Sequence, residues 1–311
     1  AAQFLDTYDR KKLRGVNEFA RGGWRATTRQ MLSEAYLAGL LSNPATQVKN
    51  IVGTGSFMLF QSATEATAGL IGATGRATNR LLGYEIADDQ VYLNDFALRF
   101  KGYIDASRDA IKSASIAFKT EMPAGASKLD VEQYTSIAGD SDSYIARGIS
   151  EFGKRARIPF RVLLFSDEYF KTISQRGELY VQANHAYQSA LRNGKSKQAA
   201  QDDAAMVLLD PNSVADELIE KSKLDTLQSD LGALTRFSKD IQRFDIAGLP
   251  IGRYILPFTV APTNAIIRSA EMVPIVNLAT PNGVSDLLGK NGPRARQQAL
   301  GRLSVGSMVL A

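Results

Sequence analysis

The chain has 311 residues, 44% of them hydrophobic, which is enough for one large core or for two to three smaller domains. Its 37 basic and 32 acidic residues give a net charge of +5, which permits contact with nucleic acid or anionic lipid without requiring it. The chain contains no cysteine, and this excludes disulfides, thiolate catalysis and cysteine-ligated zinc.

Helical periodicity dominates the sequence, and no train of alternating strands with hairpin turns is found. The sequence therefore predicts an all-α fold, an extended multi-helix assembly with a proline-rich irregular segment near 249–264. We expect an N-terminal helical region, a loop-rich connection, a second helical region and a proline-rich final part, over 1–122, 123–148, 149–247 and 248–311 respectively.

Two helices are expected near the N-terminus, over 1–19 and 24–41, separated at a pair of glycines. Arg21, Arg25 and Arg29 recur every four residues and therefore share one helical face. Such a row is either an ordinary solvated face or a surface that contacts phosphate or lipid head groups.

The next predicted helix covers 44–82 and is rich in small residues. Ser42 or Asn43, followed by Pro44, is typical of an N-cap with proline at the first helical position. From 51 to 75 there is no Lys, Arg or Asp, and about 20 helical residues suffice to cross a bilayer core. However, the run is glycine-rich and carries Glu65 near its middle, and a carboxylate is costly in lipid. Two interpretations follow: a buried helix that packs closely against other helices, or a segment that meets a membrane.

Further helices are predicted from turn and capping residues. We expect them over 88–120, from a cap at 166–168 to about 193, over 195–209, and from 210 to about 227.

The final part changes character, because three prolines between 250 and 262 preclude one regular helix. Thr263 or Asn264 is expected to cap a short helix that ends near 272. A basic stretch then precedes the apolar tail at 303–311, which is how a membrane-entering helix can begin. We expect the chain to be a piece of a longer polypeptide.

Few residues suggest chemistry. His185 is the only histidine, and no nucleophile motif, phosphate-binding glycine loop or metal-ligand spacing accompanies it. Acidic pairs such as Asp202 and Asp203 fit helix starts better than a metal site. The sequence predicts no catalytic residue, no metal and no cofactor in this segment.

Three places resemble one family, in matching order and spacing. They are Leu41 to Asn50 with Gly53, Leu163 to Lys171 with Arg176, and Leu256 to Asn264 with the helix that follows. Here the chain resembles the internal virion proteins, or ejection proteins, of short-tailed bacteriophages and related regions of large polyvalent phage proteins. It departs from the family pattern at Val260 and Ala261, where an arginine is expected.

The resemblance implies a structural protein packed in the virion core at the portal, which then forms part of a channel for viral DNA across the host envelope. It implies a location inside the capsid and, after ejection, in the periplasm and inner membrane. The implied partners are sister subunits in a homo-oligomeric ring, other core proteins and the portal, double-stranded DNA through non-specific contacts, and the host inner membrane as a further candidate. Some relatives carry a lytic transglycosylase domain, which we do not find here.

Two sets of candidate residues follow. The candidates for phosphate or lipid contact are Arg21, Arg25, Arg29, Arg294, Arg296 and Arg302. The candidates for shaping an interface are Asn43, Pro44, Pro257, Pro262, Thr263 and Asn264.

Two other functions stay open at this point. The chain could be a non-catalytic region of a virion-packaged enzyme, such as an RNA polymerase or a peptidoglycan hydrolase. Alternatively, it could be an unrelated soluble α-helical scaffold with its basic residues merely on the surface.

Overall fold

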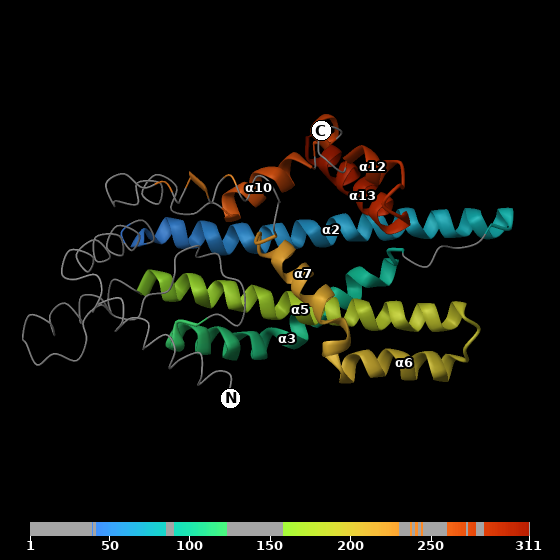
Figure 1. Cartoon of the computed structure of the whole chain (residues 1–311), viewed down its shortest axis with the longest axis horizontal. Helices are drawn as coiled ribbons and strands as arrows, with labels where there is room; N and C mark the ends of the chain where they lie inside the picture. The colour runs from blue at the N-terminus through green and yellow to red at the C-terminus, as the bar shows by residue number, and fades with distance from the viewer. Residues whose placement is uncertain are drawn as a thin grey trace, which may run out of the picture. The chain divides into compact units, whose positions relative to one another are not determined.

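Figure 1 shows the computed structural model of the chain, which describes residues 42–84, 90–122, 158–229, 260–271, 273–277 and 283–310 and positions 39, 237, 240, 241 and 244. These residues form helices and no strand. The predicted all-α class is thereby confirmed for the described part of the chain. The helices expected over 1–19 and 24–41, with Arg21, Arg25 and Arg29, and the connection expected over 123–148 lie outside the described residues.

The first long helix, α2, runs over Pro44–Leu82, as the capping pattern predicted. The side-chain Oδ1 of Asn43 accepts a hydrogen bond of 2.9 Å from the backbone N–H of Ala45. Pro44 stands at the first helical position, where no partner for an N–H group would be available in any case. Asn43 and Pro44 therefore shape the start of this helix.

Helix α3 covers Leu93–Thr120 and so begins five residues later than expected. Asp95, the third residue of the helix, explains this start. Its Oδ2 accepts a hydrogen bond of 2.8 Å from the backbone N–H of Tyr92, which is half of a capping box.

Helix α5 covers Ile158–Arg192, and its start corrects a prediction. We expected Ser166, Asp167 and Glu168 to cap it, but all three lie inside the helix and are buried. The Ser166 hydroxyl donates to the carbonyl of Leu163 at 2.9 Å, one turn back, so this polar side chain is satisfied without ending the helix.

The end of α5 follows the prediction. Gly194 adopts a φ of +78°, which glycine accepts without a steric penalty. The N–H of Gly194 bonds to the carbonyl of Leu191, and the N–H of Lys195 bonds to that of Ala190, at 3.1 and 3.0 Å. This pair of hydrogen bonds is a Schellman motif and closes the helix.

Shorter helices continue the chain. Helix α6 covers Lys197–Leu209 and is capped by the hydroxyl of Ser196, which accepts from the N–H of Ala199 at 3.2 Å. The expected helix from 210 is divided into a 3-10 turn, η1, over Pro211–Val214 and helix α7 over Ala215–Asp225.

The C-terminal helices are α10 over Val260–Ala270, α11 over Pro274–Asn277, α12 over Gly283–Leu287 and α13 over Pro293–Leu310. The start of α10 corrects two predictions, the irregular segment to 264 and the cap at Thr263 or Asn264. Pro262 is the third residue of α10, and proline is tolerated there because the first-turn N–H groups lack intrahelical partners.

The chain divides into two compact units. Unit 1 is made of Ala1–Val52, Ala114–Asp167 and Leu231–Val260, and unit 2 of Gly53–Ser113, Glu168–Asp230 and Ala261–Ala311.

In unit 1 the end of α3 packs against the start of α5. The Arg161 guanidinium forms an ion pair of 2.6 Å with Glu121 Oε1 and lies 6.0 Å from the ring centre of Phe118. Gln47 of α2 donates a hydrogen bond of 3.2 Å to the carbonyl of Pro159. Contacts of polar side chains therefore join α2, α3 and α5 in the described part of this unit.

In unit 2 the long helices cross at glycines. A β-carbon at Gly102 of α3 would lie 2.7 Å from the Cα of Gly177 in α5 and 2.8 Å from the carbonyl oxygen of Arg176. A β-carbon at Gly301 of α13 would lie 2.6 Å from the carbonyl oxygen of Thr64 in α2. No other residue fits these crossings without a shift of the backbone.

One apolar cluster in unit 2 is formed by Met58, Ala106, Ala110 and Ile173, with Tyr103, Tyr169 and Phe170 packed against it. Beside this cluster, much of the buried space holds charged side chains.

Candidate functional site

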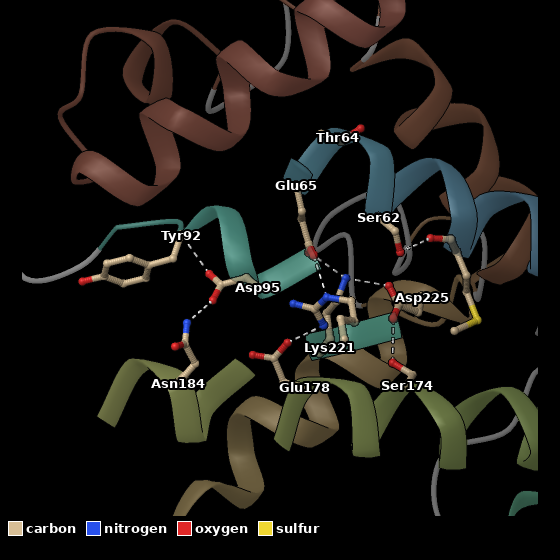
Figure 2. Close-up of polar contacts among 12 residues, drawn as sticks. Ser62, Thr64, Glu65, Tyr92, Asp95, Ser174, Glu178, Asn184, Lys221 and Asp225 are labelled. Atoms are coloured by element: carbon tan, nitrogen blue, oxygen red, sulfur yellow. Dashed lines mark hydrogen bonds and ion pairs between the residues drawn. The ribbon is translucent and has the colours of Figure 1, made fainter. Parts of the chain in front are cut away.

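A buried ionic network joins four helices of unit 2. At its centre is Arg99 of α3, which is 2% exposed. Its Nη1 donates to Glu178 Oε2 of α5 at 2.6 Å, and its Nε lies 2.6 Å from Glu65 Oε2 of α2. The contact with Glu65 is an ion pair whose angles are not those of a hydrogen bond. Figure 2 shows Glu65 and Glu178 pointing toward this centre.

Helix α7, which crosses between α2 and α5 in Figure 1, supplies the second cation, Lys221. The Lys221 ammonium lies 3.0 Å from Glu65 Oε1 and 2.8 Å from Asp225 Oδ1. The hydroxyl of Ser174 in α5 donates to Asp225 Oδ2 at 2.6 Å (Figure 2). Glu65 therefore forms ion pairs with two cations, Arg99 of α3 and Lys221 of α7.

Within the network, the electrostatics favour the ionised forms of Glu178, Arg99 and Lys221. Burial opposes the charge of Glu178, but Arg99 and Lys221 outweigh it and lower the pKa of Glu178 to about 2. Burial likewise opposes the charges of Arg99 and Lys221, and the neighbouring carboxylates outweigh it and raise both pKa values. Burial next to Asp225 raises the pKa of the Tyr103 phenol to about 12.

The charged side chains of the network form ion pairs with one another. Each carboxylate of the network contacts at least one cation, and each cation contacts two carboxylates. Within the residues that the structure describes, no group of three or more histidine or acidic side chains is placed to hold a metal ion. The network's contacts hold helices together, because removing one charge would leave its partners buried and unpaired.

The titration of Glu178 gives a pH prediction. Its folded pKa of about 2 lies below the ordinary value of 4.5, so the unfolded chain binds the proton first as the pH falls. The stabilisation is therefore present above pH 4.5 and is lost toward pH 2. The difference between the folded and unfolded pKa values of Glu178 corresponds to about 3 kcal/mol of folding stability. In urea unfolding followed across this range, the free energy should fall more steeply for the native chain than for Glu178→Gln, and equal slopes would contradict the prediction.

A second polar cluster surrounds Asp95 at the start of α3. Its Oδ1 accepts from the Asn184 side chain at 2.8 Å, and its Oδ2 lies 2.8 Å from Nε2 of His185. In Figure 2 the Asp95 carboxylate lies between the backbone of Tyr92 and the side chain of Asn184. His185, the only histidine, thus contacts the residue that caps α3, as an ordinary helical residue can.

The basic candidates of α13 do not form one exposed row. Arg296 is exposed, Arg294 and Arg302 are half-buried, and Arg302 lies 3.5 Å from Asp286 of α12. Burial lowers the pKa of Arg302. Arg294 lies close enough to Glu178 for its charge to contribute to the low pKa of that carboxyl. Two of the three arginines therefore interact with the protein's own acids.

The candidates for shaping an interface have local roles where the structure describes them. Asn264 of α10 is 1% exposed, and its Nδ2 donates to the carbonyl of Ser229 at 2.9 Å. Thr263 is half-buried beside it, and Pro262 lies in the first turn of α10. Pro257 lies outside the described residues.

Sequence reasoning missed the network, although it singled out Glu65. Arg99, Glu178, Lys221 and Asp225 look like ordinary charges of surface helices in the sequence. One signal was available, because a carboxylate within a cation-free helical run needs cations from other helices if it is buried.

The small-residue run is part of α2, next to this network. Among the described helices, none combines the length and hydropathy needed to span a bilayer.

Comparison of the chain with protein-family models, curated proteins and solved structures found no match.

Proposed function

We propose that this chain is a structural, non-catalytic part of an internal virion protein of a short-tailed bacteriophage. In this proposal it is packed at the portal and forms part of the path by which viral DNA crosses the host envelope. The observation that carries the proposal is the set of three sequence motifs in matching order, at 41–53, 163–176 and 256–274.

The described residues of these motifs have structural roles, which supports a structural function. Asn43 of the first motif caps α2. Leu163 and Leu164 of the second are 3% and 2% exposed. Asn264 of the third is buried and donates to the carbonyl of Ser229. Motif residues that maintain helix ends and packing fit a family that shares an architecture.

The polar chemistry of unit 2 also supports a non-catalytic role. A catalytic site needs polar groups that converge on a space for substrate. In the described part of unit 2, the largest set of convergent charges is closed on itself by contacts of 2.6 to 3.0 Å. Such a set stabilises helix packing and leaves no charge directed toward a substrate.

The proposal includes the partners that the family likeness implies. These are sister subunits, other core proteins, the portal and, through non-specific phosphate contacts, double-stranded DNA. The exposed Arg296 is the α13 candidate best placed for such a contact. The proposed location is the capsid interior before infection and the host envelope after ejection.

The test is mass spectrometry of purified phage particles that encode the chain. Its peptides should be present in intact particles, should resist protease added outside, and should leave the capsid when DNA release is triggered. Peptides found in infected cells but absent from particles would contradict the proposal. A catalytic domain elsewhere in the full reading frame would favour the packaged-enzyme alternative.

A further inference from the structure

Helix α7 is held in unit 2 mainly by polar contacts. Its buried side chains are Leu218, Lys221, Ser222 and Asp225, and the first of these is the only apolar one. Lys221 forms an ion pair with Glu65 of α2, and Asp225 accepts a hydrogen bond from Ser174 of α5. Docking of α7 therefore removes little apolar surface from water, and the hydrophobic contribution to its position is small.

The ionic contacts of α7 add little net stability to its docked position. Burial removes the charges of Lys221 and Asp225 from water, and this cost offsets much of their attraction to neighbouring charges. When α7 leaves, both charges return to water together, and Glu65 keeps its ion pair with Arg99. Detachment thus differs from a substitution in the network, because it leaves no charge buried without a partner.

Helix α7 also has little helical stability of its own. Its 11 residues are fewer than the about 12–15 that an isolated helix needs, and its N-cap residue, Val214, makes no side-chain hydrogen bond to it. At its end the N–H of Gln228 bonds to the carbonyl of Lys223 at 2.7 Å, as in the Schellman motif of α5. Where α5 has Gly194, however, α7 has Leu227 at a φ of +60°, which is strained for a bulky side chain.

The other long helices of unit 2 are joined by contacts that do not involve α7. Arg99 of α3 pairs with Glu65 of α2 and Glu178 of α5. Helices α3 and α5 cross with their backbones in contact at Gly102, and all three helices contribute to the apolar cluster around Met58. Water cannot replace the apolar contacts of this cluster, so these helices separate at a higher free energy than α7 detaches.

We propose that α7 is a detachable strap, which leaves its place and returns while α2, α3 and α5 stay packed. The docked strap closes one side of the ionic network, and water reaches Glu65 and Arg99 when it detaches. Neither state requires a virion, a membrane or DNA, so the strap is tested on the purified full chain, separately from the proposed function.

Hydrogen exchange of the native chain, followed by mass spectrometry of its peptides, tests the proposal first. The bonded amides of α7 should exchange at least about tenfold faster than those in the middle of α5. Their exchange should also depend less on added urea, because detachment exposes less surface than unfolding of the unit. Amides of α7 that exchange at the same rate as those of α5, and with the same urea dependence, would overturn the proposal.

A single thiol distinguishes detachment from fraying of a helix that stays docked. The chain has no cysteine, so Ser222→Cys places its only thiol on the buried face of α7. In the folded chain, a thiol reagent should label this site at least about tenfold faster than the site in Ala110→Cys, which lies in the apolar cluster of α3. Equal protection of the two thiols would overturn the proposal.

Gly102→Ala separates the two opening events by their energy. The crossing of α3 and α5 is present whether the strap is docked or detached, so weakening it should leave the detachment of α7 unchanged. Exchange of the α3 and α5 amides should become about tenfold faster, while that of the α7 amides stays the same. Acceleration of the α7 amides by the same factor would show that α7 opens only when the unit unfolds, and would overturn the proposal.

Discussion

Replacing Arg99 by methionine should destabilise the protein by about 3–5 kcal/mol, the largest effect expected for any single substitution in unit 2. Methionine fills much of the same space, so the loss comes from charge and not from a cavity. Glu65 and Glu178 would remain buried without the guanidinium that contacts both at 2.6 Å.

Urea unfolding followed by circular dichroism measures this loss. Lys101→Met is the control, because it removes a cation of the same helix from a pair that is exposed to solvent, and it should change stability little. Combining Arg99→Met with Glu65→Gln and Glu178→Gln should recover part of the loss, since fewer unpaired charges stay buried. Equal stabilities of the Arg99 and Lys101 variants would show that the network does not hold the helices together.

Adding one methyl group at Gly102 should destabilise the protein by about 1–3 kcal/mol. The new β-carbon would lie 2.7 Å from the Cα of Gly177 and 2.8 Å from the carbonyl oxygen of Arg176. Both are backbone atoms, so no side chain can rotate away and α3 must move from α5. The same substitution elsewhere in a helix is normally favourable, since alanine has the higher helix propensity.

Gly75→Ala provides that comparison. Gly75 lies inside α2, and a β-carbon added there would meet no atom within 4 Å, so the substitution should stabilise the protein by about 0.5–1 kcal/mol. Thermal unfolding of the two variants should therefore move in opposite directions. A Gly102→Ala variant as stable as Gly75→Ala would mean that α3 and α5 are not in backbone contact at this crossing.

Much of the helical framework could be predicted from local residues. The start of α2 depends on Asn43 and Pro44, and the end of α5 depends on Gly194, and each acts within a few residues of the chain. The local sequence pattern is therefore sufficient to predict the start of α2 and the end of α5. The division of the helix expected from 210 into η1 and α7 was harder to predict, because Asp210 caps a 3-10 turn before the α-helix begins.

Helix boundaries that depend on tertiary contacts were predicted wrongly. Ser166, Asp167 and Glu168 are typical of a helix start, yet they are buried inside α5. Polar residues favour helix ends because water or backbone N–H groups satisfy them there. Ser166 is instead satisfied by the carbonyl of Leu163 within α5, and the burial of all three residues follows from how α5 packs, which the local sequence does not reveal.

The ionic network could be predicted only in part, for the same reason. Glu65 stands out in the sequence because its helical run lacks cations, but Arg99 and Lys221 lie 34 and 156 residues further along the chain. Their pairing follows from how α3 and α7 pack on α2. The arginines of α13 show the converse, since Arg302 was a candidate for phosphate contact and instead lies beside Asp286.

The most direct test of the proposed function is a cryo-EM map of the phage particle before and after DNA ejection. The proposal predicts helical density at the portal of the filled particle, in which α2, α3 and α7 meet around Glu65 and α3 crosses α5 at Gly102. This density should be absent from the portal after ejection. A filled particle without such helices at the portal, or with the same density after the DNA has left, would contradict the proposal.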